Sequence, residues 1–234
     1  MRAPLSLIPK EAVIPIVQGP LFGRRWIVGS ATHGCWLGTY EHTKHRLFAK
    51  SILPGSVVFD LGANVGLYTL TAAQRVGPAG RVLAFEPLPR NVQFLRRHLA
   101  LKYVTNVDVI EAAVSGSSGV ASFQEADSPL SGRLGTTGSI HVRTVTIDEM
   151  VFDHGLPAPD VVKIDIEGGE TAALEGSRRV LALNHPLVFL ATHGYEARQQ
   201  CRDLLTGMGY ALEGVDDKAG AGYDEFIARY TSPS

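Results

Sequence analysis

The chain has 234 residues, of which 45% are apolar and 19% are charged, as is typical of a globular protein with one large domain. Its 22 basic and 23 acidic residues give a net charge of −1, so it lacks the basic excess of most nucleic-acid-binding domains. Two cysteines, Cys35 and Cys201, are too few for a disulfide framework. Composition therefore argues against nucleic-acid binding and against a disulfide-stabilised secreted domain.

Residues 1–53 differ from the rest of the chain, because they are rich in Pro, Gly, aromatic residues and His and show no sustained period. Prolines interrupt residues 1–22, where a signal peptide needs an unbroken apolar stretch. No apolar run approaches the roughly 18 residues of a membrane span, so we expect a cytoplasmic protein. Residues 34–50, GCWLGTYEHTKHRLFAK, predict a turn and a short amphipathic helix. We interpret residues 1–53 as a cap or substrate lid on a main domain, residues 54–234.

From residue 55 onward, short apolar runs alternate with segments of helical spacing. Strands are predicted over 57–61, 81–87, 106–114, 161–168 and 186–193, helices over 68–76, 89–101, 170–183 and 195–208, and closing strands over 210–215 and 225–230. The strands are nearly all apolar, which indicates a parallel sheet covered by helices on both faces. The Gly- and Ser-rich residues 127–139 predict a long loop, either a surface loop or a substrate lid.

A carboxylate and a glycine turn follow the first of these strands in VVFDLGANVGLYTL, residues 57–70. Ligands bind at the carboxyl ends of parallel strands, and Gly62 and Gly66 let the backbone approach a ligand closely. The dinucleotide fingerprint is broken, because Asn64 and Leu67 replace two of its glycines. Asp60 would also repel a pyrophosphate by about a few kcal/mol. The same carboxylate suits a ligand that carries an ammonium group and no phosphate, such as S-adenosylmethionine.

Two further strand ends support a nucleoside site. Glu86 ends the second strand, where an acid can accept both hydroxyls of a ribose. On the third strand, the small residues Ala112 and Ala113 leave room for an adenine, and Glu111 could meet its amino group; packing alone would explain the alanines equally well.

Together these segments resemble the FkbM-type methyltransferases, a branch of the class I S-adenosylmethionine-dependent enzymes. The resemblance covers about residues 36–195 and is carried by LGTYE, VVFDLGANVGLYTL, AFEPLPRNVQFL, VIEAAVS, VRTVTIDEM and VVKIDIEGGETAALEGSRRVL. It implies an α/β fold of the Rossmann-like class I type, with a seven-stranded, mostly parallel sheet whose last strand is antiparallel. It also implies methyl transfer from S-adenosylmethionine, commonly to oxygen, on sugars, polyketides, lipids or other small metabolites.

The resemblance assigns roles to residues by position. Asp60, Gly62, Asn64 and Gly66 cradle the methionine half of the cofactor, Glu86 takes the ribose, and Asp165 lies near the methyl group. The family often has an acid two residues before a His-like position after the fifth strand. Here Ala191 stands in place of the acid, while His193 is retained.

A hydroxyl acceptor must lose a proton, and Asp165 and His193 are the candidate catalytic bases because they are expected to end adjacent strands. A structural role for His193 is the alternative. Strand alternation also leaves open a divalent metal held by Asp165, Glu167 and His193, but no dedicated ligand spacing supports it. Glu167 is interpreted more simply as a cap on the following helix.

In the cap, Trp36, Tyr40 and Glu41 are candidate substrate-binding residues, because aromatic rings can stack on a sugar or ring acceptor; packing of the cap is the alternative role for the two rings. The favoured function is an O-methyltransferase for a small molecule, with no nucleic-acid partner. An N- or carboxyl-methyltransferase, or a non-catalytic cofactor-binding module, stays open. A nicotinamide oxidoreductase is disfavoured by Asp60, Asn64 and Leu67.

Overall fold

The main domain is built on a seven-stranded sheet. The computed structural model describes residues 5–101, 103–125, 132–135, 140–215 and 223–231. The strand order is β12-β13-β11-β10-β3-β4-β5, and only β13 runs antiparallel to its neighbours. The bounds are β3 Val57–Leu61, β4 Arg81–Phe85, β5 Val107–Ile110, β10 Val161–Ile164, β11 Leu187–His193, β12 Tyr210–Gly214 and β13 Tyr223–Tyr230. The predicted class I sheet, with its antiparallel last strand, is therefore confirmed.

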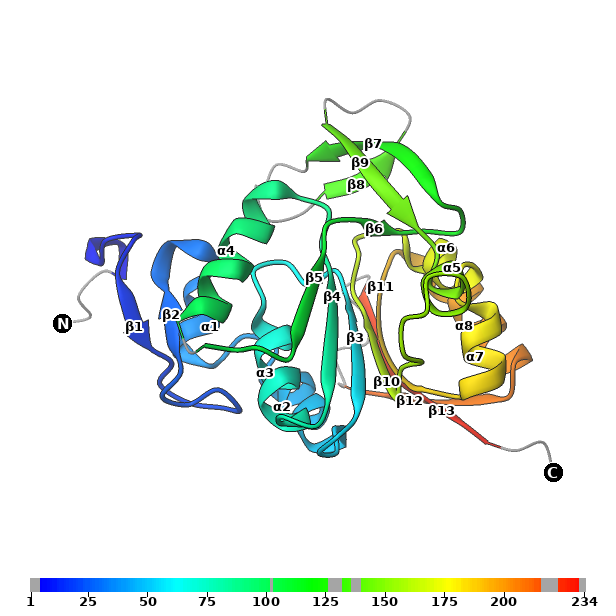
Figure 1. Cartoon of the computed structure of the whole chain (residues 1–234), viewed down its shortest axis with the longest axis horizontal. Helices are drawn as coiled ribbons and strands as arrows, with labels where there is room; N and C mark the ends of the chain where they lie inside the picture. Colours follow the sequence, from blue (N-terminus) through cyan, green and yellow to red (C-terminus); the bar gives the residue numbers. More distant parts are fainter. Residues whose placement is uncertain (1–4, 102, 126–131, 136–139, 216–222, 232–234) are drawn as a thin grey trace.

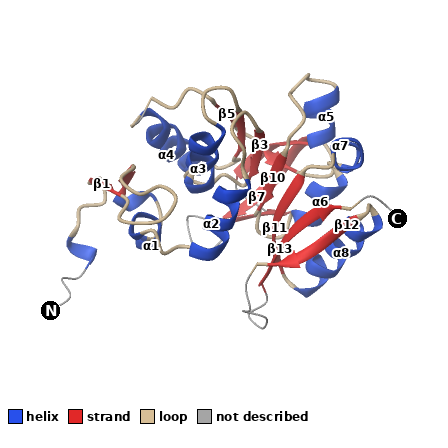
Figure 2. Ribbon diagram, turned by 90° about the horizontal axis from the view of Figure 1, so that it is seen from below, coloured by secondary structure: helices blue, strands red, loops and turns tan. Residues whose placement is uncertain are grey.

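Helices cover both faces of this sheet (Figures 1 and 2). On one side lie α2 (His42–Ser51), α3 (Leu67–Val76) and α4 (Pro89–Ala100). On the other lie α5 (Ile147–Phe152), α6 (Glu170–Glu175), α7 (Arg178–Asn184) and α8 (Tyr195–Gly207). Apolar side chains on both faces of β3, β4, β10 and β11 account for this layering, because each face must be removed from water.

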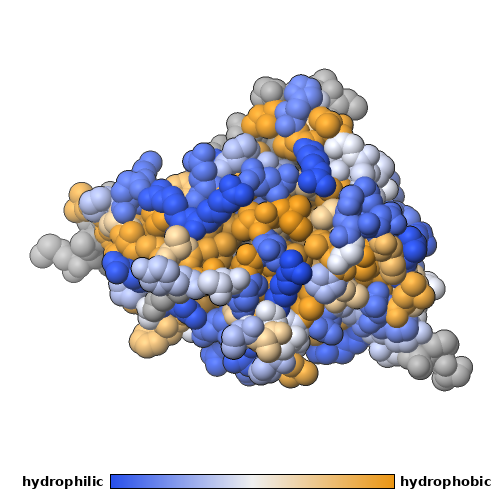
Figure 3. Space-filling model, viewed as in Figure 1, coloured by the Kyte–Doolittle hydropathy of each residue, from blue (hydrophilic) through white to orange (hydrophobic). Residues whose placement is uncertain are grey.

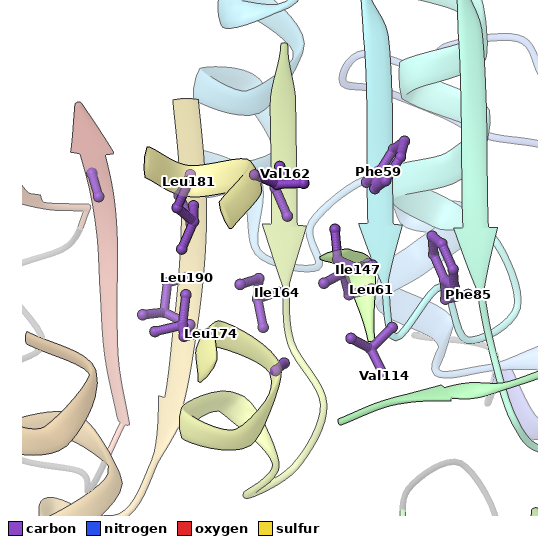
Figure 4. Packing of buried hydrophobic residues seen from close by; sticks show 14 of the residues in the cluster. Phe59, Leu61, Phe85, Val114, Ile147, Val162, Ile164, Leu174, Leu181 and Leu190 are labelled. Atoms are coloured by element: carbon purple, nitrogen blue, oxygen red, sulfur yellow. The ribbon is translucent and has the colours of Figure 1, made fainter. Parts of the chain in front are cut away.

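The core divides according to strand alternation. One set of side chains, which includes Phe59, Leu61, Val162, Ile164 and Leu190, forms a buried cluster with Ile147 of α5, Leu174 of α6 and Leu181 of α7 (Figure 4). Residues at intervening positions, such as Val58, Val82, Phe189 and Ile227, pack instead against Phe48 of α2 and Tyr68 of α3. Asp60 and Lys163 occupy intervening positions and are paired across β3 and β10, so both face α2 and α3.

A second sheet interrupts the alternating pattern. It has the order β6-β9-β7-β8, formed by β6 Ala113–Val114, β7 Gly119–Glu125, β8 Gly132–Gly135 and β9 Ile140–Val145. The single strand predicted over 106–114 is therefore wrong. The chain leaves the main sheet after Ile110, where Ala112 N donates back to the Ile110 carbonyl, and β6 pairs with β9 instead. Of the loop predicted over 127–139, residues 127–131 and 136–139 lie outside the described residues, and the part between them is β8.

The helix predicted over 170–183 is two helices, α6 and α7. The backbone at Gly176 approaches Ser115 so closely that a Cβ there would lie 2.2 Å from the Ser115 carbonyl oxygen. The Asp148 carboxylate accepts hydrogen bonds from the Arg179 and Val180 amides at 2.9 Å, which satisfies the first turn of a new helix. The chain thus ends α6 at the close approach of Gly176 to Ser115, and Asp148 caps the start of α7.

The N-terminal segment contains η1 Leu5–Leu7, the ribbon of β1 Val13–Pro15 and β2 Arg25–Ile27, then η2 Val28–Ser30 and α1 His33–Leu37. Trp26 and Trp36 are buried in a cluster with Ala63, Leu95 and other residues of the main domain. In the view of Figure 3, apolar residues run from this segment across the middle of the molecule. Among the described residues, none of the helices is long and apolar enough to cross a membrane.

Candidate active site

A cavity of about 1070 Å³ opens at the carboxyl ends of β3, β4, β10 and β11. Its walls come from the turn after β3, the ends of β4 and β5, the segments after β10 and β11, and the N-terminal segment; the lining includes Gly62, Asn64, Glu86, Ala112, Asp165, Glu167, His193, Tyr195, Thr32, Tyr40 and Glu41. This is the edge at which open parallel sheets bind ligands. The volume is at the upper end for small-molecule sites.

The turn after β3 requires glycine. Gly62 has φ +79°, and a Cβ there would lie 2.1 Å from the Asp165 carbonyl oxygen. The Gly62 and Ala63 amides both donate to the Phe85 carbonyl, which ties the turn to the end of β4. Gly66 (φ +100°) faces Leu95, not the cavity. Gly66 was predicted to cradle the cofactor, but it shapes the turn and does not line the cavity, whereas Gly62 and Asn64 do.

Glu86 is a buried carboxylate held by three donors. It accepts from the Asn64 amide at 2.8 Å, the Leu88 amide at 3.0 Å and the Asn91 side chain at 3.2 Å. Burial raises the pKa of Glu86, and these hydrogen bonds oppose the rise. The group lines the cavity in a fixed orientation, so it is able to accept hydrogen bonds from a bound polyol.

Asp60 does not reach the cavity. Its side chain is wholly buried, accepts from the Thr69 hydroxyl at 2.6 Å and lies 3.3 Å from the Lys163 ammonium. Lys163 in turn donates to the Gly62 carbonyl at 2.9 Å. The prediction that Asp60 contacts a ligand directly is therefore wrong. Strand alternation turns the Asp60 side chain toward α3, and Asp60 supports the glycine turn through Lys163.

Asp165 is the carboxylate that lines the cavity beside the turn. Burial acts to raise its pKa, but Lys163, Lys44 and His193 outweigh burial, so the pKa of Asp165 lies below its usual range. The Lys44 ammonium is 3.6 Å from Asp165, 2.9 Å from Glu41 and 2.7 Å from Glu225. Sequence analysis missed this cluster, because Lys44 and Glu225 are 181 residues apart and share no motif.

His193 is oriented by a buried acid. Its Nδ1 is 2.7 Å from Glu170 Oε1, and its Nε2 is 3.8 Å from Asp165 and 3.6 Å from Glu167. A neutral His193 that donates from Nδ1 to Glu170 therefore presents Nε2 as an acceptor on the cavity side. Burial alone would lower the pKa of His193, but Glu170, Asp165 and Glu167 raise it above 6.5.

The segment after β10 corrects the role given to Glu167. Glu170, not Glu167, accepts from the Gly168 amide at the start of α6, while Glu167 lines the cavity near His193. Sequence analysis placed Glu170 at the helix start but missed its contact with His193. Among the described residues, His, Cys, Asp and Glu side chains form no group of three suited to a metal ion.

Of the other predicted residues, Tyr40, Glu41 and Ala112 line the cavity, but Trp36 and Glu111 do not. Trp36 is buried, donates from Nε1 to His33 Nδ1 at 3.0 Å, and packs in the cluster that joins the N-terminal segment to the main domain. Glu111 lies at the bend after β5, where its half-exposed carboxylate pairs with Arg96 at 2.6 Å. Both were predicted as binding residues, and the structure gives neither a place in the cavity wall.

Tyr195, at the start of α8, is a cavity residue that sequence analysis did not select. Its side chain is 78% exposed, although it is aromatic. The available signal was its position two residues after His193, directly following FLATHG, residues 189–194.

Residues 60–212 match the Methyltransferase FkbM domain. The chain belongs to the FkbM methyltransferase family. Hexuronic acid methyltransferase AglP of Haloferax volcanii is 30% identical to it over 138 residues, which make up 58% of this chain and only 56% of AglP. The 31-O-demethyl-FK506 methyltransferase FkbM of Streptomyces tacrolimicus is 27% identical over 76% of this chain and 82% of that protein.

The fold agrees with this assignment. The crystal structure of methyltransferase FkbM from Methylobacillus flagellatus superposes with a TM-score of 0.53, at 17% identity, over 85% of this chain and 55% of that one. As a member of the FkbM family, the chain uses S-adenosylmethionine.

The site fits that cofactor by charge. Glu41, Asp60, Asp165 and Glu225 surround two ammonium groups, Lys44 and Lys163, so the cluster has two more negative than positive charges. Such an excess in a half-buried site favours a cationic ligand.

Proposed function

We propose that this FkbM methyltransferase transfers a methyl group to a hydroxyl of a small molecule. The observation that carries the proposal is the Glu170–His193 pair, which presents His193 Nε2 on the cavity wall beside Asp165. A hydroxyl must lose its proton when it attacks a methyl group, and an oriented imidazole is suited to accept it.

In the proposed reaction, one group of residues binds the cofactor and another binds the acceptor. Glu86 would bind the ribose, Ala112 would lie against the adenine, and the turn at Gly62 and Asn64 with Asp165 would hold the methionine half. S-adenosylmethionine supplies an electrophilic methyl group when it is bound. Tyr40, Glu41 and Tyr195, which also line the cavity, would bind the acceptor and hold its oxygen in line.

The charge of the walls favours a small acceptor over a nucleic acid. The described lining carries six carboxylates and a single lysine, Lys163; the carboxylates are Glu41, Glu86, Asp165, Glu167, Glu175 and Glu196. A phosphate backbone would be repelled there, because nucleic-acid sites depend on clustered cations. The names of the relatives AglP and FkbM, a hexuronic acid methyltransferase and an O-demethyl-FK506 methyltransferase, point in the same direction.

The test is an acceptor screen with methyl-labelled S-adenosylmethionine. The panel contains neutral sugars, uronic acids, polyketide alcohols, amines, carboxylic acids and an RNA oligonucleotide. We expect label on a hydroxyl oxygen of a small molecule, identified by mass and by the methyl carbon resonance. A product methylated on nitrogen, carboxylate or RNA would refute the proposal, and a chain that binds cofactor but labels nothing would favour a non-catalytic module.

His193→Ala is the variant that separates catalysis from binding in this screen. We expect turnover to fall by about 10²-fold or more while S-adenosylhomocysteine affinity is kept, because general-base catalysis contributes on that order. An unchanged rate would remove His193 from the mechanism and leave Asp165 as the candidate base.

A further inference from the structure

The sheet aligns two carboxylates on either side of Ala191. Ala191 is paired with Glu225 across β11 and β13, and the two side chains point to the same face. On the other side, Lys163 of β10 is paired with Phe189 of β11. Asp165 lies two residues after Lys163, and Ala191 lies two residues after Phe189. Asp165 is therefore level with Ala191. Because Ala191 carries only a methyl group, α2 can place the Lys44 ammonium between Asp165 and Glu225.

Lys44 is held unevenly by its carboxylates. Its ammonium is 2.7 Å from Glu225 and 2.9 Å from Glu41, but 3.6 Å from Asp165. The first two distances are those of charge-assisted hydrogen bonds, whereas the third is a looser ion pair. The side chain of Lys44 is only 6% exposed, so water cannot easily replace a partner that is lost.

We propose that Glu225 is a positioning residue for the cofactor: it holds the Lys44 ammonium back from Asp165, which leaves the charge of Asp165 available to the cofactor's ammonium group. The inference rests on the proposed placing of the methionine half beside Asp165. Glu225 itself does not line the cavity and acts only through Lys44.

Lys44 and the cofactor's ammonium group compete for the charge of Asp165, which Lys163 also faces at 3.9 Å. Without the charge of Glu225, Lys44 gains by moving closer to Asp165, since opposite charges in a half-buried site attract strongly. Asp165 would then be neutralised by the protein, and the ammonium of a ligand would find a weaker partner. Removing Lys44 as well would return the charge of Asp165.

The experiment is calorimetric titration of four full-length proteins: wild type, Glu225→Gln, Lys44→Gln/Glu225→Gln and the control Asp108→Asn. The control removes the exposed ion pair between Asp108 and Arg81, which lies on the sheet away from the cavity wall. The ligands are S-adenosylhomocysteine and 5′-methylthioadenosine. The second shares the nucleoside and the thioether but has no ammonium or carboxylate.

We expect Glu225→Gln to weaken S-adenosylhomocysteine binding about fivefold to tenfold, while 5′-methylthioadenosine binding stays within about twofold. The double variant should recover most of the lost affinity for S-adenosylhomocysteine, and the control should match wild type. A purely structural role for Glu225 predicts instead that both ligands weaken together and that the second substitution makes binding worse.

If both ligands weaken together, or if Glu225→Gln binds S-adenosylhomocysteine as tightly as wild type, the inference is overturned while the proposed function stands. If wild type binds neither ligand, the placing of the cofactor fails as well, and the inference fails with it. The outcomes are therefore distinguishable.

Discussion

At the scale of single residues, contacts decide what each carboxylate can do. Asp60, Asp165 and Glu86 all lie at or just beyond the carboxyl ends of strands, yet Asp60 is wholly buried against Thr69 and Lys163, whereas the other two line the cavity. The motif identified all three as candidates. Only the alternation of side chains, together with the place where each strand ends, determines which of them a ligand can reach.

Glu170→Gln tests how His193 is tuned. The pKa of His193 is raised above 6.5 chiefly by Glu170, so the neutral imidazole needed as a base is populated only above that raised value. The rate in wild type should therefore rise as the pH increases through the raised pKa of His193. In Glu170→Gln the rising limb should move to lower pH and the maximal rate should fall, because the ring loses its orienting charge. A pH profile of kcat measures both effects, and a limb that does not move would exclude His193 as the titrating base.

At the scale of elements, the turn between β3 and α3 is the most constrained segment of the site. Gly62→Ala should cost roughly 1–2 kcal/mol from its positive φ and further stability from the approach of Cβ to Asp165, and it should weaken cofactor binding. Gly55→Ala is the matched control, since Gly55 also has a positive φ (+85°) but nothing lies within 4 Å of its Cβ position.

Thermal unfolding and S-adenosylhomocysteine titration of both glycine variants separate strain from function. Gly55→Ala should lose stability and keep affinity, whereas Gly62→Ala should lose both. Equal affinities in the two variants would show that the turn does not hold the cofactor.

The elements of the main sheet were predictable because both faces of its strands are buried, which leaves a strong apolar signal in β3, β4, β10 and β11. The second sheet was not, since β6 has only two residues and its partner β9 lies about 30 positions away. The break between α6 and α7 depends on Asp148, a residue outside both helices.

At the scale of the whole molecule, hydrogen bonds of His98 connect the N-terminal segment to the glycine turn. The Ile27 amide donates to His98 Nε2 at 3.2 Å, and His98 Nδ1 donates to the Val65 carbonyl at 2.7 Å. Trp26 stacks on the ring at a centroid distance of 4.0 Å. Both ring nitrogens are therefore used by a neutral imidazole, which joins the N-terminal segment to the turn that lines the cavity.

Acidification should weaken this connection. Burial lowers the pKa of His98 from 6.5 to about 4, so the unfolded chain binds the proton more readily between these values. Stability from His98 is complete above about 6.5 and is lost as the pH falls toward 4. We expect His98→Gln to be less stable at neutral pH and to show a flatter fall of Tm between pH 6.5 and 4 than wild type. A parallel fall in both proteins would contradict the assignment.

The ion pairs of Lys44 with Asp165 and Glu225 could not be predicted from the sequence, because these partners lie far away along the chain. Lys44 comes from α2 and Glu225 from β13, and their contact depends on the strand order of the whole sheet. Neither residue has a motif of its own, whereas Asp165 and His193 could be found because each follows a strand with a readable pattern.

The central claim is that the cavity holds S-adenosylmethionine, with Glu86 on its ribose. The most direct measurement is calorimetric titration of wild type and Glu86→Ala with S-adenosylhomocysteine, with NADH as the comparison ligand. We predict micromolar binding of S-adenosylhomocysteine to wild type, affinity at least about tenfold weaker in Glu86→Ala, and no binding of NADH. Equal affinities in the two proteins, or tight binding of NADH alone, would contradict the account.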